Sequence, residues 1–226
     1  MRVLSLIHGP LVRAELFGDV IDERGHELVE WDIRTQGRPP EGFDAVIVFG
    51  GDMNVGEEDR HPWLHDEYEL LRSWVTDDTP LLGVCLGGQT LAHAFGAPVS
   101  KLATQQAGFV PVALTAAGIA DPVLGSLPAH FDALVGNGYG FAIPAGAELL
   151  ATNPATPQAF RIGERAWGVQ FHPEARRDQV LAWFEEDKPP RSLAELAQEI
   201  DAGIELWHEL GRALCSAFLD VAKSTS

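Results

Sequence analysis

The feature that most constrains this chain is a cysteine flanked by glycines at the end of an apolar run. Residues 80–89 read Pro-Leu-Leu-Gly-Val-Cys-Leu-Gly-Gly-Gln, so that Gly83 and Gly87 stand two positions on either side of Cys85. A buried strand that turns sharply into a helix holds such a side chain clear of the sheet, and the neighbouring backbone passes too close for a Cβ. The pattern therefore predicts a nucleophile elbow in an α/β fold.

The same arrangement favours a reactive sulfur at Cys85. A helix predicted over residues 87–95 would direct its N-terminal amides and the positive end of its dipole toward the sulfur. Both stabilise the thiolate, which is the reactive form of cysteine. The alternative interpretation is a small buried cysteine at the end of a core strand. The polar Gln89, so close to a core strand, favours the functional interpretation.

A second motif, His172-Pro173-Glu174, follows an apolar strand predicted over residues 166–171. Sites in parallel sheets assemble at the carboxyl ends of the strands. There His172 could take the proton of a thiol and return it to a departing amine, while Glu174 orients the ring and stabilises the imidazolium. A histidine near a glutamate is common, so the motif gains its meaning from partnership with Cys85. Of the other seven histidines, His8 stays a candidate because it directly follows the first predicted strand.

Two glycines, Gly50 and Gly51, follow the strand predicted over residues 45–49. Acyl transfer requires hydrogen-bond donors for the oxyanion that develops on the attacked carbonyl. Backbone N–H groups at such glycines can point into a cleft at the sheet edge, and we expect Gly51 and Leu86 to provide the donor pair. The alternative is an ordinary Gly-Gly turn between a strand and a helix.

Short apolar runs alternate with helical patterns through the first half of the chain, which is typical of a mainly parallel sheet. Strands are predicted over residues 2–7, 27–31, 45–49, 81–84 and 166–171, and helices over residues 11–24, 63–75, 87–95 and 175–186. Between residues 99 and 150, segments broken by Gly and Pro predict a small antiparallel stretch. The expected fold is therefore α/β, with an open, mainly parallel central sheet flanked by helices, as in flavodoxin-like proteins.

A Pro-Pro pair separates the predicted domain, residues 1–188, from a helical extension over residues 191–222. Ser192 and Glu195 form a capping box at its start. An apolar stripe then follows at helical spacing: Leu193, Leu196, Ile200, Ile204, Trp207, Leu210, Leu214 and Phe218. The stripe could support a homodimer, but we expect it to dock on its own domain, because amphipathic helices usually face their own core.

The chain is strongly acidic, with 33 acidic and 16 basic residues and a formal charge of −17. This charge repels nucleic-acid phosphates and anionic lipids, so neither is an expected partner. No apolar run approaches the roughly 20 residues that span a bilayer. The two cysteines, Cys85 and Cys215, form no disulfide framework and no metal-binding spacing. We therefore expect a cytoplasmic protein without a metal or cofactor.

Together the motifs resemble those of class I glutamine amidotransferases, particularly the amidotransferase domain of GMP synthase. They comprise residues 50–53, 61–64, 80–89 and 168–174, and the resemblance extends from about residue 3 to residue 184. It implies an open α/β fold, hydrolysis of glutamine to glutamate and ammonia, and a thioester intermediate. It also implies that Cys85 is the nucleophile, His172 the base and Glu174 its orienter, and that Gln89 binds the substrate.

Departures from the family pattern at Gln106 and Asn137 leave a second substrate class open, the γ-glutamyl peptides or γ-glutamyl amines. Because no Walker-type phosphate loop and no synthetase domain is recognised, ammonia would pass to a separate synthetase subunit or be the product of a simple hydrolase. A third interpretation is a non-catalytic subunit that binds a partner through the C-terminal helix.

Overall fold

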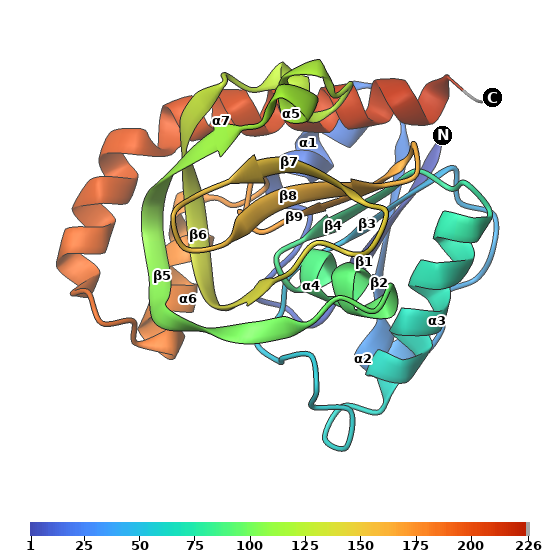
Figure 1. Ribbon diagram of the computed structural model, residues 1–226, viewed down its shortest axis with the longest axis horizontal. Helices are drawn as coiled ribbons and strands as arrows, with labels where there is room; N and C mark the ends of the chain where they lie inside the picture. The colour runs from blue at the N-terminus through green and yellow to red at the C-terminus, as the bar shows by residue number, and fades with distance from the viewer. Residues whose placement is uncertain (225–226) are drawn as a thin grey trace.

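Five strands of largely apolar sequence form the parallel part of a single mixed sheet in the computed structural model, which describes residues 1–224 (Figure 1). Within those residues the sheet has nine strands in the order β2-β1-β3-β4-β9-β8-β7-β5-β6. The parallel strands are β1 (Arg2–Ile7), β2 (Glu27–Asp32), β3 (Ala45–Val48), β4 (Leu81–Val84) and β9 (Ala166–Val169). Every residue of β3, β4 and β9 is buried, as expected for parallel strands covered on both faces.

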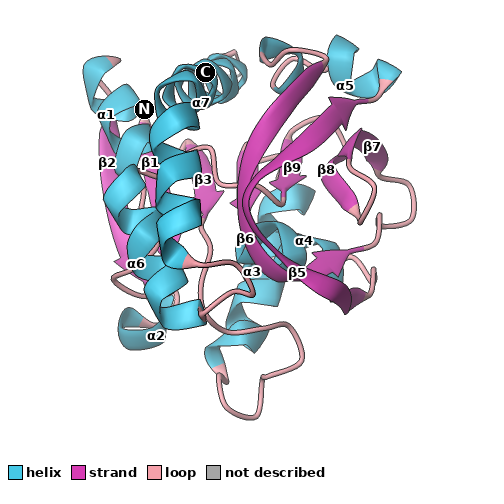
Figure 2. Cartoon of the chain, turned by 90° about the vertical axis from the view of Figure 1, so that its left-hand side faces the viewer, coloured by secondary structure: helices cyan, strands magenta, loops and turns pink. Residues whose placement is uncertain are grey.

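The remaining four strands extend the sheet in antiparallel fashion beyond β9. They are β8 (Pro157–Ile162), β7 (Glu148–Thr152), β5 (Val99–Leu114) and β6 (His130–Phe141). Figure 2 shows β5 and β6 as a long, curved pair. The predicted α/β fold, with its mainly parallel sheet and antiparallel addition, is thus confirmed. The antiparallel part is larger than expected, because it continues past residue 150 through β8.

Helices cover both faces of the sheet and bury two separate apolar clusters. On one face lie α1 (Glu15–Glu23), α6 (Arg177–Asp187) and α7 (Leu193–Lys223), and on the other lie α2 (Ile33–Gln36), α3 (Trp63–Thr76) and α4 (Leu86–Ala94). Two short elements, α5 (Ala116–Ala120) and η1 (Leu124–Ser126), follow β5. The first helix begins later than predicted, because residues 8–12 form a loop that lines a cavity.

The long helix α7 packs on the same core as α1 and α6 (Figure 2). Its buried apolar residues include most of the predicted stripe: Leu196, Ile200, Ile204, Trp207, Leu214 and Phe218. At Gly211 a Cβ would overlap the backbone oxygen of Pro173, so the helix lies directly against the segment that follows β9. The apolar face of α7 therefore packs against the rest of the same chain. The domain boundary near residue 190 and the homodimer stay predictions. In residues 1–224, no helix combines the length and apolar character that crossing a membrane requires.

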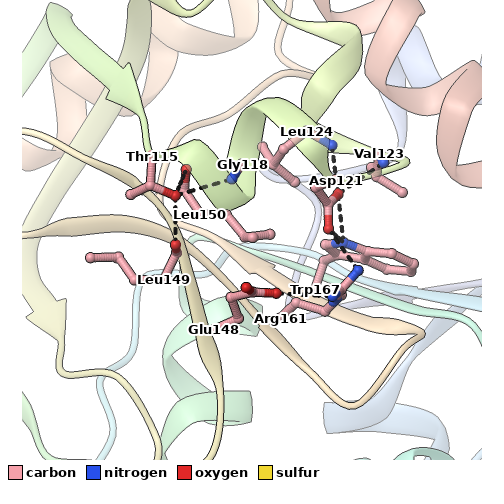
Figure 3. A network of polar contacts seen from close by, with 10 residues as sticks. All are labelled: Thr115, Gly118, Asp121, Val123, Leu124, Glu148, Leu149, Leu150, Arg161 and Trp167. Atoms are coloured by element: carbon pink, nitrogen blue, oxygen red, sulfur yellow. Dashed lines mark hydrogen bonds and ion pairs between the residues drawn. The ribbon is translucent and has the colours of Figure 1, made fainter.

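A buried carboxylate ties the segment after β5 to the strands β8 and β9 (Figure 3). Asp121 accepts hydrogen bonds from the backbone N–H groups of Val123 and Leu124, and from Nε1 of Trp167 at 3.1 Å. Arg161 pairs with the same carboxylate at 3.1 Å, and the Asp121 side chain is only 1% exposed. A buried charge with this many donors is well compensated. The network thereby anchors β9, the strand that leads into His172.

We expect Gly211→Ala to destabilise the protein, although alanine is the better helix former. The new methyl group would overlap the Pro173 carbonyl, and overpacking of this kind costs about 1–3 kcal/mol. Urea unfolding should show the loss as a lower midpoint at an unchanged slope. The control is Glu209→Ala on an exposed position of α7, which should change the unfolding free energy by less than about 0.5 kcal/mol. Equal stability of the two variants would contradict the close approach of α7.

Candidate active site

Cys85 stands in a strained turn between β4 and α4. Its backbone has φ 52° and ψ −107°, a region that costs a non-glycine residue about 1–3 kcal/mol. The turn is held by a hydrogen bond from the Cys85 N–H to the oxygen of Val169 at 2.8 Å. A Cβ on Gly83 would overlap the backbone of Gly87, and a Cβ on Gly87 would overlap that of Val48. The two glycines are therefore required by backbone packing around the turn.

The end of β9 brings His172 and Glu174 to this turn. Nδ1–H of His172 donates to Oε1 of Glu174 at 2.8 Å, which leaves Nε2 to face other partners. His172 lies close enough to the Cys85 sulfur for its charge to raise the pKa of the ring, and a Cβ on Gly50 would lie 3.0 Å from Cε1 of His172 and 3.6 Å from Cβ of Cys85. The structure therefore brings Cys85, His172 and Glu174 together, with Gly50 beside them.

The charges around His172 favour its protonated form. Burial alone lowers the pKa of a histidine, but the Glu174 carboxylate and the Cys85 sulfur oppose it, and together they raise the pKa of His172 above its ordinary value. The Glu174 side chain is fully buried, so its charge acts in a medium that screens little. These surroundings favour an imidazolium at His172, a form that can give a proton to a leaving group.

Sequence reasoning missed Gln170, which donates from Nε2 to the sulfur of Cys85 at 3.5 Å. Gln170 is fully buried, and its Oε1 accepts a hydrogen bond from Nε2 of Gln89 at 3.2 Å. Gln89 also donates to the backbone oxygen of Tyr139 at 3.1 Å and does not line the cavity. A contact between Gln89 and the substrate stays a prediction, whereas the structure shows Gln89 bonded to Gln170. The sequence signal that could have identified Gln170 is its polar side chain within the apolar run that precedes His172.

Cys85 and His172 open into a cavity of about 730 Å³, including the part open to solvent. The other walls of the cavity come from the loop after β1, from α2, from the segment after β3, and from β6 and α6. The residues that line them are His8, Gly9, Pro10, Leu11, Val12, Arg34, Gly50, Gly51, Asp52, Gly136, Trp183, Glu186 and Asp187. Neither Gln106 nor Asn137 lines it. Among the described residues, no cluster of histidine, cysteine or carboxylate side chains could hold a metal ion.

The cavity wall is acidic, since Asp52, Glu186 and Asp187 outnumber the one guanidinium, that of Arg34. Burial raises the pKa of Asp187, and the carboxylates of Glu186 and Asp52 raise it further. Arg34 is held by Asp32, with Nη2 3.0 Å from the carboxylate. A bound molecule would therefore meet an excess of negative charge around the opening.

Both predicted oxyanion donors lie beside the cysteine. Gly51 lines the cavity, and no atom of residues 1–224 accepts a hydrogen bond from its N–H. Leu86 is the first residue of α4, where backbone N–H groups have no partner within the helix. A Cβ on Gly51 would lie 3.0 Å from Cδ2 of Leu86, so Gly51 packs against the Leu86 side chain. The arrangement can present two N–H groups to a carbonyl oxygen attacked by Cys85.

Comparisons with known proteins point to one family. The profile described as "Glutamine amidotransferase class-I" matches residues 21–180. The glutamine-hydrolyzing GMP synthase of Thermomicrobium roseum is 33% identical over 151 residues, which cover 66% of this chain and 26% of that enzyme. The glutamine amidotransferase-like protein YfeJ of Salmonella typhimurium is 29% identical over 186 residues, covering 77% of this chain and 76% of YfeJ. The chain thus spans about a quarter of the length of this GMP synthase.

The fold is also found among solved structures. A glutamine amidotransferase from Thermotoga maritima superimposes with a TM-score of 0.86 at 24% identity, covering 96% of this chain and 97% of that one. A glutamine amidotransferase from Methylobacillus flagellatus gives a TM-score of 0.85 at 19% identity. These likenesses concern the fold, whereas the family profile covers most of the sequence itself. This chain therefore belongs to the class I glutamine amidotransferase family.

Proposed function

We propose that this protein is a cysteine-dependent hydrolase that cleaves the side-chain amide of glutamine and releases ammonia and glutamate. The observation that carries the proposal is that Cys85, at its strained turn, lies in one cavity with His172, whose pKa it raises and whose ring Glu174 orients. Family membership supports the same substrate, since the GMP synthase relative is named as glutamine-hydrolyzing.

In the proposed reaction the Cys85 thiolate attacks the side-chain carbonyl carbon of glutamine, and the N–H groups of Gly51 and Leu86 stabilise the oxyanion. The His172 imidazolium gives its proton to the amide nitrogen, the C–N bond breaks, and ammonia leaves a thioester on Cys85. His172 then takes a proton from water, which attacks the thioester. Collapse of the second oxyanion breaks the C–S bond, releases glutamate and restores the thiolate and the imidazolium.

The destination of the ammonia is part of the proposal. The matched relative is a glutamine-hydrolyzing GMP synthase, so its name combines glutamine hydrolysis with a synthetase. We propose that a synthetase likewise takes up the ammonia released here, and that the protein acts in the cytoplasm, where its thiols stay reduced.

The triad predicts a clear mutational pattern in an assay of ammonia release from glutamine. Cys85→Ala should remove activity completely, because no other group near the cavity can form the thioester. His172→Asn should lower kcat about 100- to 10,000-fold, the usual contribution of a positioned acid–base group. The control is Cys215→Ala: this thiol is fully buried in α7, outside the cavity, and burial raises its pKa. It should keep the parent rate, and activity retained in Cys85→Ala would refute the mechanism.

A second candidate, hydrolysis of γ-glutamyl amines, is favoured by the acidic wall of the cavity. Asp52, Glu186 and Asp187 could hold a cationic leaving group that glutamine lacks. The departures from the family pattern at Gln106 and Asn137 do not support this candidate, because neither residue lines the cavity.

The two candidates separate in a comparison of kcat/KM for glutamine and for a γ-glutamyl diamine. If the acidic wall binds the amine, Glu186→Gln should lower kcat/KM for the diamine about tenfold more than for glutamine. Glu185→Gln is the matched control, since it makes the same change on the neighbouring position of α6, outside the cavity. A parent enzyme that prefers glutamine, with equal effects of both variants, would exclude the second candidate.

A further inference from the structure

A second buried histidine–carboxylate pair lies beside the active site and has no role in the proposed reaction. His8 follows β1 and Glu67 lies on α3, and both side chains are completely buried. Nε2 of His8 is 2.6 Å from Oε2 of Glu67, and Nδ1 is 3.1 Å from the backbone oxygen of Gly50. Buried ionisable groups are costly to keep, so a pair in this position calls for an explanation.

Both ring nitrogens of His8 face oxygen atoms. The carbonyl of Gly50 can only accept a hydrogen bond, so Nδ1 carries a hydrogen. The Glu67 carboxylate at Nε2 and the ring of Trp63, stacked at 5.1 Å with an interplanar angle of 21°, both favour a positive charge on the imidazole. Burial lowers the pKa of His8, but the charge and hydrogen bond of Glu67 outweigh it and raise the pKa above its ordinary value.

The carbonyl that His8 holds belongs to the same peptide group as the N–H of Gly51. A trans peptide group is planar, so its C=O and N–H point in opposite directions, and fixing one fixes the other. A charged donor on the oxygen also polarises the group and strengthens the N–H as a donor. The fit is close, because a Cβ on Gly51 would lie 2.9 Å from Cβ of His8.

We propose that His8 and Glu67 are positioning residues of the oxyanion site, which aim and polarise the Gly51 N–H through the Gly50 carbonyl. The inference rests on the oxyanion role given to Gly51 in the proposed function. Glu67 keeps the His8 ring in place and balances its charge, while Nδ1–H holds the carbonyl. Neither side chain contacts the substrate in this role.

The test compares two reactions of Cys85 that differ in their need for an oxyanion site. Acylation by a p-nitrophenyl ester passes through a tetrahedral oxyanion, whereas alkylation by iodoacetamide is a direct displacement at carbon. Mass spectrometry assigns both products to Cys85 rather than Cys215. A defect in the oxyanion site lowers the first rate only, while a disordered site lowers both.

Two variants of His8 separate its two hydrogen bonds. The amide of His8→Gln reaches the position of Nε2 and keeps Glu67, but it leaves Gly50 without its donor. The amide of His8→Asn reaches the position of Nδ1 and keeps Gly50. We expect His8→Gln to lower ester acylation about 100-fold, the cost of misplacing a catalytic group by about 1 Å. His8→Asn should lose less than about tenfold, and both variants should be alkylated within about twofold of the parent.

Two further variants complete the design. Glu67→Gln preserves the shape of the pair while removing its charge, and it should lower acylation several-fold with alkylation unchanged, even if the His8 variants do not fold. His93→Gln is the matched control: His93 packs on Tyr68 with ring centroids 4.8 Å apart, lies outside the cavity, and should keep both rates. In glutamine turnover, His8→Gln should lower kcat while KM stays within about twofold.

Several outcomes would overturn the positioning role. Acylation and alkylation that fall together in His8→Gln and Glu67→Gln would make the pair a structural support only. An acylation rate that is unchanged in His8→Gln and in Glu67→Gln would show that the pair does not position the Gly51 N–H. The same conclusion would follow if the ester never acylates Cys85 in the parent protein although iodoacetamide alkylates it. A parent that is acylated yet hydrolyses no γ-glutamyl amide would instead refute the proposed function and leave the positioning test valid.

Discussion

The left-handed turn at Cys85 is the constraint on which the rest of the site depends. A cysteine gains nothing locally from φ 52°, so the conformation persists only because the surrounding structure enforces it. That enforcement comes from the two fully buried neighbours of β4 in the sheet. Carbonyl groups at Val48 in β3 and Val169 in β9 press against Gly87 and Gly88, where a side chain would not fit. The turn at Cys85 therefore depends on β3 and β9 lying on either side of β4, and this close packing in turn depends on glycine at positions 87 and 88.

The histidine side of the site is held by elements that are distant in the sequence. The N–H of His172 donates to the oxygen of Leu134 in β6 at 2.9 Å, and Nε1 of Trp207 in α7 donates to the His172 oxygen at 2.8 Å. The N–H of Leu16 in α1 donates to the oxygen of Glu174 at 3.1 Å. The antiparallel addition and α7 thus do more than cover the sheet, since they fix the backbone that carries the base and its orienter.

The parts of the fold that local sequence determines were predictable. Apolar runs marked the parallel strands, and the spacing of Gly83, Cys85 and Gly87 marked the turn, because the steric need for glycine is set within a few residues. Contacts between distant segments were not predictable in the same way. Gln170 meets Gln89 across 81 positions and His8 meets Glu67 across 59, so no local pattern relates them. The acidic wall of the cavity, shared by Asp52 and α6, could be recognised only in three dimensions.

The charge on the His172 ring can be measured by NMR titration of its two nitrogens. We expect a protonated ring at neutral pH, because Glu174 and the Cys85 sulfur both raise the pKa of His172. In Cys85→Ala one of these two charges is gone, so the pKa should fall while the bond to Glu174 remains. A neutral ring at pH 7 in the parent protein, or a His172 pKa that does not change when the sulfur is removed, would show that Glu174 and Cys85 do not charge the ring.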